Sequence, residues 1–141
     1  MLNWKALVLG AIADFAGSYL GTWVLVFIWV VALKLQGTTD ENLLKTAQHS
    51  PLLLAISVTV GWYFDFLGGR VAGLIAKRQG MLHGFAAGFP GVILAFMQSA
   101  DVEDPMFPTW FMVVCCAISL LCAGYGGARA VQGLNLEPNQ D

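Results

Sequence analysis

Two aspartates, Asp14 and Asp65, interrupt long apolar stretches of the chain. A carboxylate at membrane depth is costly unless it is protonated, paired or hydrated, so each residue needs a partner or a function. The functional alternative is a site for a proton, a cation or a cationic ligand. The structural alternative is that each carboxyl is hydrogen-bonded within the bundle, to Tyr19, Ser18, Tyr63, Thr59 or a basic group. Among the basic groups we expect Arg70 to reach Asp14 across a helical hairpin. Arg70 itself lies about 140° around the helix from Asp65, which is unfavourable for a pair within one helix.

Aromatic side chains accompany both acids. Tyr19 follows Asp14 by five residues, and Trp62 and Tyr63 precede Asp65. The face of an aromatic ring attracts a cation, and a phenol hydroxyl can donate a hydrogen bond to a carboxylate. We therefore include Tyr19, Trp62 and Tyr63 with the two acids in a candidate ligand or proton site.

No other group of residues has the spacing of a catalytic or metal site. Cys115, Cys116 and Cys122 fall within one apolar run, where we expect them to act as small hydrophobic residues. His83 is the one histidine near an apolar span, and we expect it to be a polar residue at the membrane interface. A nucleophile, a base and an orienting group do not occur together at a usable spacing. We therefore predict no enzymatic activity, no cofactor and no metal.

The composition indicates the environment of these residues. Hydrophobic residues make up 57% of the 141 residues and charged residues 11%, against about 25% in an ordinary soluble domain. The apolar runs are long enough to cross a hydrocarbon layer roughly 30 Å thick as helices. The net charge of −2 and the lack of a basic run argue against nucleic acid as a partner. The chain is therefore predicted to be an integral membrane protein surrounded by the lipid bilayer.

We expect residues 1–141 to form a single transmembrane domain with four spans, approximately at 6–33, 51–76, 82–97 and 106–131. Ser50 and Pro51 predict the start of the second span, since serine caps helices and proline is favoured at the first helical position. The polar segment between the first two spans contains Thr38 and Glu41 at the spacing of a capping box. This spacing indicates a short interfacial helix over residues 39–48.

The basic residues predict an orientation. If the amino terminus is cytoplasmic, five Lys and Arg residues lie at the cytoplasmic ends of the spans and two at the opposite ends. Cytoplasmic loops of membrane proteins are enriched in Lys and Arg. We therefore expect both termini to be cytoplasmic.

Small residues recur in every span at intervals of four, three and four, which keeps them on one helical face. In lipid, such faces let helices approach closely and gain van der Waals contact. Asp14 and Asp65 take the second position of this stripe in the first two spans, and Ser119 begins the stripe of the fourth. The residues assigned to helix packing, within the chain or between copies, are Gly10, Gly17, Gly21, Gly61, Gly68, Ala72, Gly84, Gly88, Gly91 and Gly126.

The second and fourth spans end alike. Residues 66–72 are Phe-Leu-Gly-Gly-Arg-Val-Ala, and residues 124–130 are Gly-Tyr-Gly-Gly-Ala-Arg-Ala. This likeness indicates two tandem helical hairpins in the same orientation, a parallel 2+2 repeat. The predicted fold class is therefore all-α, an integral membrane four-helix bundle built from two hairpins.

Two segments resemble known families. Segment 68–84, in which Gly-Gly-Arg-Val-Ala-Gly is followed by Lys-Arg and Leu-His-Gly, resembles a pattern in small, uncharacterised four-span proteins of bacterial inner membranes. This resemblance implies a bacterial inner-membrane location and supplies no activity. Separately, residues 13–18, Ala-Asp-Phe-Ala-Gly-Ser, look like the Ala-Glu-x-x-Gly-Thr segment in the first helix of small multidrug resistance transporters.

The second resemblance implies a role for Asp14, because the acid of that family exchanges protons against cationic drugs within a dimer. The chain departs from the family pattern in having aspartate instead of glutamate, a long loop after the first span and a second acid at Asp65.

Two functions remain open at this point. The first is a non-enzymatic membrane subunit or accessory factor that packs through its small faces into a homo-oligomer or against another membrane protein. The alternative is a small proton-coupled or cation transporter or channel that uses Asp14 and Asp65.

Overall fold

The computed structural model describes residues 2–39, 42–43, 46–47, 49–100 and 108–136. Within these ranges the chain forms four helices: α1 (Trp4–Leu35), α3 (Pro51–Ala76), α4 (Gly80–Ala100) and α5 (Thr109–Leu136). The described ranges contain no strand, so the predicted all-α class is confirmed. Each of the four helices is long and apolar enough to cross a membrane.

The ends of the helices follow from their capping residues. The hydroxyl of Ser50 accepts a hydrogen bond from the backbone N–H of Leu53 at 3.3 Å, and Pro51 opens α3, as the sequence predicts. α4 begins two residues earlier than expected, and α5 continues to Leu136 instead of residue 131. α5 runs past its apolar stretch through the polar residues Gln132 and Asn135, so hydropathy marks its end too early. The expected start of the fourth span at residue 106 lies outside the described residues.

The segment between α1 and α3 includes helical pieces. Within the predicted interfacial helix 39–48, residues 42–43 and 46–47 are helical and Thr39 is not, whereas the others, including Glu41, lie outside the described residues. The described side chains pack inward, in one apolar cluster of Leu43, Ala47, Leu33, Leu53, Leu25, Trp29 and Val30. This cluster joins the segment to the adjoining ends of α1 and α3.

A tight turn over residues 77–79 joins α3 to α4. Lys77 has a left-handed backbone (φ 58°), and its N–H donates a 3.0 Å hydrogen bond to the carbonyl oxygen of Gly73. Gly80 then begins α4 directly against α5, where an added Cβ would overlap the carbonyl oxygen of Gly127. The turn therefore brings the start of α4 into contact with α5.

The interior of the bundle consists of small residues, and its surface of large apolar ones. Ala72, Ala87 and Ala123 are buried, while Phe27 is 69% exposed and Trp110 is 65% exposed. A folded protein in water does not usually expose large contiguous apolar surfaces. Helices that associate in lipid instead bury small residues and leave large apolar side chains facing the hydrocarbon.

The tightest helix contact joins α3 to α5. A Cβ added to Gly69 would overlap the backbone carbonyl of Ala123, and a Cβ added to Gly126 would overlap the carbonyl oxygen of Phe66. Glycine permits this approach because it has no side chain. Gly126 is one of the residues assigned to packing from the sequence, whereas Gly69 is not.

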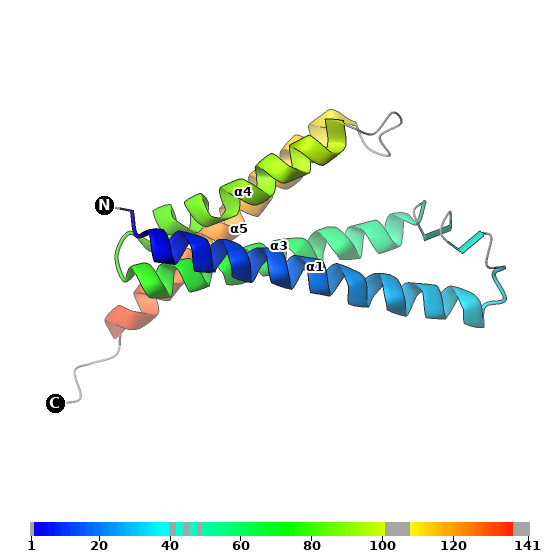
Figure 1. Cartoon of the computed structure of the whole chain (residues 1–141), viewed down its shortest axis with the longest axis horizontal. Helices are drawn as coiled ribbons and strands as arrows, with labels where there is room; N and C mark the ends of the chain where they lie inside the picture. The colour runs from blue at the N-terminus through cyan, green and yellow to red at the C-terminus, as the bar shows by residue number, and fades with distance from the viewer. Residues whose placement is uncertain (1, 40–41, 44–45, 48, 101–107, 137–141) are drawn as a thin grey trace.

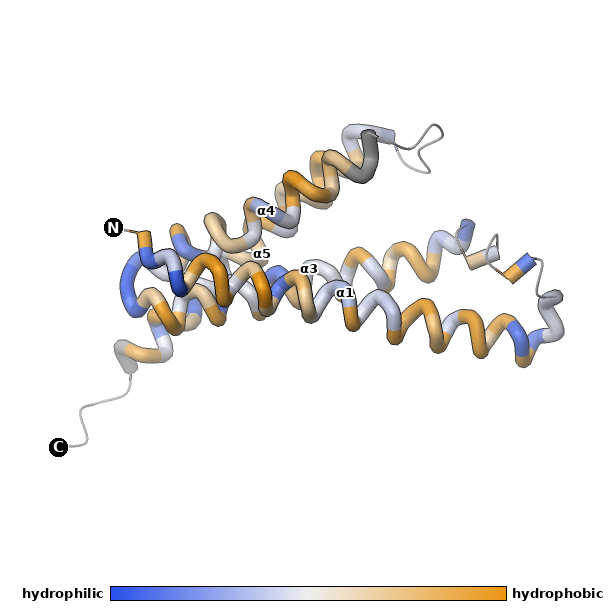
Figure 2. Tube along the Cα trace, in the orientation of Figure 1, coloured by the Kyte–Doolittle hydropathy of each residue, from blue (hydrophilic) through white to orange (hydrophobic). Residues whose placement is uncertain are grey.

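The two helix pairs diverge. α1 packs along α3, α4 packs along α5, and α3 contacts all the other helices. Figure 1 shows the helices gathered at the end that holds the start of α1 and the end of α5, and the α1–α3 and α4–α5 pairs separating toward the opposite end. Figure 2 shows that apolar residues predominate along both pairs. The bundle is therefore V-shaped.

Candidate cation or proton site

Asp14 on α1 and Asp65 on α3 face each other, with their carboxyl groups within hydrogen-bonding reach of each other. Ionised carboxylates only accept hydrogen bonds, so a hydrogen bond between them requires a proton on one of the two groups. Asp14 is 5% exposed. We call these two residues the acid pair. A pair of this kind that holds one proton carries one net negative charge.

Each acid also accepts a hydrogen bond from a serine. The hydroxyl of Ser18, one turn further along α1, donates to Oδ1 of Asp14 at 3.3 Å. The hydroxyl of Ser119, on α5, donates to Oδ2 of Asp65. These donors stabilise negative charge on whichever carboxyl lacks the proton. Three helices therefore contribute side chains to the acid pair.

Small residues bring the acids together. A Cβ added to Gly68 would lie 2.6 Å from the Cβ of Asp14, and a Cβ added to Gly10 would lie 2.7 Å from the Cβ of Ala72. The small stripes of α1 and α3 therefore pack on each other. Their second members, Asp14 and Asp65, meet as a result.

The acid pair lies in a cleft of about 310 Å³ that all four helices line. Its walls include Phe15 of α1, Trp62 of α3, Val92 of α4 and Met112 of α5. The indole N–H of Trp62 donates to the carbonyl oxygen of Cys115 at 3.3 Å, which fixes this ring between α3 and α5. Ligand pockets typically measure about 300–1,000 Å³, so the cleft is large enough for a small organic molecule.

The predicted ion pair between Arg70 and Asp14 is not formed between these described residues. Arg70 is exposed, and the polar partners of Asp14 are Ser18 and Asp65. The reason is the rotation of α3, since Gly68 faces Asp14 and a residue two positions later points away from α1. No basic residue is among the described residues that line the cleft.

Of the three predicted aromatic residues, Trp62 lines the cleft and the two tyrosines do not. Tyr19 is 66% exposed and makes an edge contact with Trp23, with ring centroids 6.1 Å apart. Tyr63 is 59% exposed and packs against Phe64. Residues next to an acid in sequence project in different directions from a helix, so the two tyrosines lie outside the cleft although they are close to the acids in sequence.

Most residues assigned to packing lie against another helix of the same chain: Gly10, Gly17, Gly21, Gly68, Ala72, Gly84, Gly88 and Gly126. Gly61 and Gly91 differ. A Cβ added to Gly61 would have no neighbouring atom within 4 Å. A Cβ added to Gly91 would lie 3.8 Å from Oδ2 of Asp14. Both residues line the cleft instead, which corrects their assignment. The other small faces are occupied within the chain and leave little space there for a second copy.

Sequence reasoning missed several residues of the cleft. Ser119 was recognised only as a small residue, although its hydroxyl contacts Asp65. Cys115 and Cys116 were treated as hydrophobic residues, and they lie one turn before Ser119 on the same face. Phe15 directly follows Asp14 and also lines the cleft. The sequence pattern that could have identified these residues is their spacing. Cys115 and Cys116 precede Ser119 by about one helical turn, and Phe15 is adjacent to Asp14.

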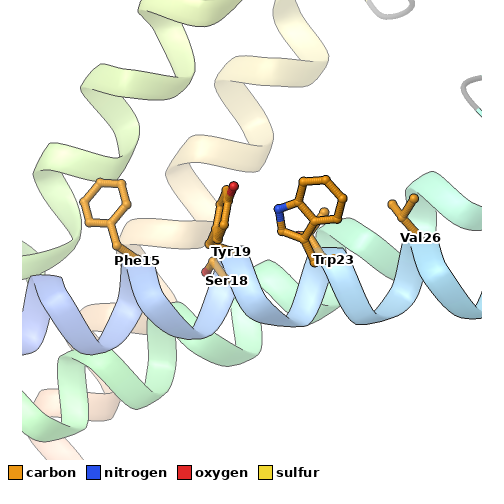
Figure 3. Close-up of a pocket in the computed structure, with 6 residues that line it drawn as sticks. Phe15, Ser18, Tyr19, Trp23 and Val26 are labelled. Atoms are coloured by element: carbon orange, nitrogen blue, oxygen red, sulfur yellow. The ribbon is translucent and has the colours of Figure 1, made fainter.

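A groove of about 450 Å³ runs along α1 and is lined by Phe15, Ser18, Tyr19, Thr22, Trp23 and Val26. We call it the α1 groove. Figure 3 shows Phe15, Tyr19, Trp23 and Val26 projecting from one side of α1, on the side of the view where α4 and α5 pass. Phe15 and Ser18 line both the groove and the cleft. The α1 groove and the cleft therefore border each other at these two residues.

His83 is buried within the bundle, with only 2% of its surface exposed. Its Nε2 accepts a hydrogen bond from the backbone N–H of Asn3 at 3.0 Å, and its Nδ1 lies 3.1 Å from the carbonyl oxygen of Gln79. Both contacts are satisfied by a neutral ring with its proton on Nδ1. His83 therefore joins the start of α1 to the start of α4, away from the acid pair.

Among the described residues, no group of three or more His, Cys, Asp or Glu side chains is arranged to hold a metal ion. Comparison of the chain with protein-family models, with curated proteins and with solved structures finds no significant match.

Proposed function

We propose that the protein is a small integral membrane transporter in which the Asp14–Asp65 pair exchanges a proton for a monovalent cation. The observation that carries this proposal is the close approach of the two carboxyl groups in a cleft whose described lining has no basic side chain. The proton that the pair shares leaves when a cation takes its place between the carboxylates. Because one positive charge replaces another, the net charge of the pair stays at minus one.

The distribution of charge supports an orientation for this transporter. Lys5, Lys77, Arg78 and Arg129 belong to the end of the bundle where the helices converge. By the positive-inside rule this end is cytoplasmic, and the V opens to the other side of the membrane. The membrane that we propose is a bacterial inner membrane. The α1–α3 pair and the α4–α5 pair are then the two members of a parallel repeat. Acidic residues within the helices occur in the α1–α3 pair, as Asp14 and Asp65.

The test uses purified protein in liposomes that contain a pH-sensitive dye. An imposed gradient of a monovalent cation should drive protons in the opposite direction. Asp14→Asn and Asp65→Asn should abolish this flux without loss of helix content by circular dichroism. Ser57→Ala is the matched control, because the Ser57 hydroxyl donates to the carbonyl oxygen of Leu53 within α3 and lies outside the cleft.

The proposal fails if the unmutated protein gives no proton-linked cation flux. If both aspartate variants in addition lower the thermal stability of the bundle, the acid pair has a structural role. Intact flux in the Asp14→Asn and Asp65→Asn double variant would exclude the pair as the site of exchange.

A second candidate function is a non-enzymatic subunit or accessory factor, either in a homo-oligomer or with another membrane protein. The exposed rings of Tyr19 and Trp23 on α1 favour it, since a partner helix would cover them. Purification from native membranes in a mild detergent separates the two candidates. A stoichiometric partner that is lost in the Trp23→Ala variant, together with no flux from the isolated protein, would favour the accessory role.

A further inference from the structure

A separate polar hollow of about 360 Å³ lies at the narrow end of the V. It is lined by Asn3, Ala76, Arg78, Gln79 and His83, so four of its five lining residues have polar side chains. None of these residues lines the cleft of the acid pair. We call this hollow the terminal pocket. Its volume is within the range of small-ligand sites.

Segments that are distant in sequence form the wall of the terminal pocket. Asn3 precedes α1, and the turn that follows α3 supplies Arg78 and Gln79. Figure 1 shows the start of α1 close to this turn. The ring of His83 hydrogen-bonds to the backbone of both Asn3 and Gln79, which holds the segments in place. The pocket is therefore a product of the tertiary fold and not of a single loop.

Arg78 brings a positive charge to the pocket. Its exposed guanidinium forms no ion pair or hydrogen bond with another described residue. Asp14 and Asp65 are the acids among the described residues, and neither lines the pocket. A guanidinium presents five N–H donors in a planar fork that matches the oxygens of a phosphate or a carboxylate. The pocket is therefore suited to an anion.

The neighbouring side chains add neutral donors. The side-chain oxygen of Asn3 accepts from the Lys5 N–H, which leaves the amide nitrogen of Asn3 as a donor. Gln79 carries a second amide, whereas both ring nitrogens of His83 are already bonded. A phosphate group has more acceptor oxygens than a carboxylate and can accept from the guanidinium and both amides together. This set of donors therefore favours phosphate.

The position of the pocket agrees with this ligand. It lies at the basic end of the bundle, which the positive-inside rule places at the cytoplasmic surface. Basic pockets between transmembrane helices at this surface bind the head groups of anionic lipids. Segment 68–84, whose resemblance to other proteins supplies no activity, contributes Arg78, Gln79 and His83 to the pocket. Phosphate binding gives these residues a role that the acid pair does not.

We propose that the terminal pocket binds an anionic phosphate group, with Arg78 as its charged donor and the amides of Asn3 and Gln79 as neutral donors. The group belongs either to an anionic phospholipid of the adjoining leaflet or to a soluble phosphate. In both cases it links the start of α1 to the α3–α4 turn and stabilises the narrow end of the V. Binding includes no covalent step and is independent of the exchange proposed for the acid pair.

The test measures thermal unfolding of delipidated full-length protein in dodecyl maltoside, a detergent without phosphate. In one series, sodium phosphate replaces sodium chloride at constant ionic strength. In a second series, dihexanoylphosphatidylglycerol is added. Its control is dihexanoylphosphatidylcholine, in which a choline cation neutralises the phosphate. A ligand that binds the folded state raises the midpoint of unfolding as its concentration increases.

At saturation, phosphatidylglycerol or inorganic phosphate should raise the midpoint by roughly 5 °C or more. Arg78→Gln should raise the half-saturating concentration at least about tenfold, because it removes charge-assisted hydrogen bonds. Gln79→Gly keeps the left-handed backbone of this position (φ 49°) and should raise the concentration several-fold. Lys77→Gln removes the same charge from the same turn, but Lys77 does not line the pocket, so the concentration should hardly change.

The two sources of phosphate are distinguished by their affinities. If phosphatidylglycerol binds far more tightly than inorganic phosphate, the bound group belongs to a lipid, and if inorganic phosphate binds as tightly, it belongs to a soluble ligand. Both results support the inference. Absence of stabilisation by either compound overturns it, as does equal stabilisation by phosphatidylcholine.

Equal weakening of binding in Arg78→Gln and Lys77→Gln would also overturn the inference, since the net charge of this end would then account for the binding. The measurement reports stability and not flux. The phosphate site and the exchange at the acid pair therefore stand or fail separately.

Discussion

The backbone N–H of Asn3 donates a 3.0 Å hydrogen bond to Nε2 of His83, although the two residues are 80 positions apart. Asn3 also caps α1, since its side chain accepts a hydrogen bond from the backbone N–H of Lys5. One residue therefore both begins α1 and attaches it to α4. This contact closes the narrow end of the V, opposite to the end at which the helix pairs separate.

Removal of the His83 ring should loosen this end. His83→Phe removes the acceptor of the Asn3 N–H in a part-buried contact, which should cost about 0.5–1.5 kcal/mol. His83→Gln should lose less, because its carbonyl oxygen can still accept. Reversible unfolding in mixed detergent micelles measures the difference. Equal stability of the unmutated protein and the phenylalanine variant would contradict the assigned hydrogen bond.

Two glycines of α3 should respond oppositely to the same substitution. Gly69→Ala places a methyl group onto the backbone carbonyl of Ala123, which cannot move without shifting α5. We expect the free energy of unfolding to fall by about 1–3 kcal/mol. Gly61→Ala meets no atom within 4 Å and gains helix propensity, so it should be neutral or stabilising by up to about 1 kcal/mol. Unfolding curves of both variants give the comparison, and equal losses would contradict the α3–α5 contact.

The ring of Phe64 occupies the space that Gly17 and Gly21 leave on α1. Gly17→Leu should therefore destabilise the bundle by collision with this ring, and Phe64→Ala should destabilise it by about 3–5 kcal/mol through the cavity it creates. Together the two changes should cost less than the sum of their separate effects, because the leucine partly fills the cavity. A double-mutant cycle measures this coupling, and strict additivity would show that the two residues do not touch.

Ser119→Ala should weaken the site without unfolding the protein. A hydrogen bond to a charged group contributes about 1.5–3 kcal/mol, so the half-saturating cation concentration in the liposome assay should rise at least about tenfold. Ser119→Thr keeps the hydroxyl and should retain most of the activity. Ser57→Ala, which lies outside the cleft, should leave the concentration unchanged. An unaltered Ser119→Ala variant would exclude its hydrogen bond to Asp65 from cation binding.

Much of this architecture was accessible from local sequence. Apolar runs and the Ser50–Pro51 cap depend on neighbouring residues, so four long helices and the start of α3 were predictable. Asp14 and Asp65 stood out because their apolar surroundings are visible in the chain itself. Their shared position in the small stripe also indicated that they lie on packing faces.

The partners of these residues depended on how the helices are rotated and how far the pairs diverge. Those quantities are set by contacts between distant segments, such as Gly69 with Ala123 and Asn3 with His83. Spacing along one helix could not show that Ser119, and not Arg70, supplies a partner to the acid pair. It also could not distinguish Gly61, which faces open space, from Gly68, which lies against Asp14, because both belong to the same stripe. The cleft exists only where four helices meet, so tertiary packing alone created it.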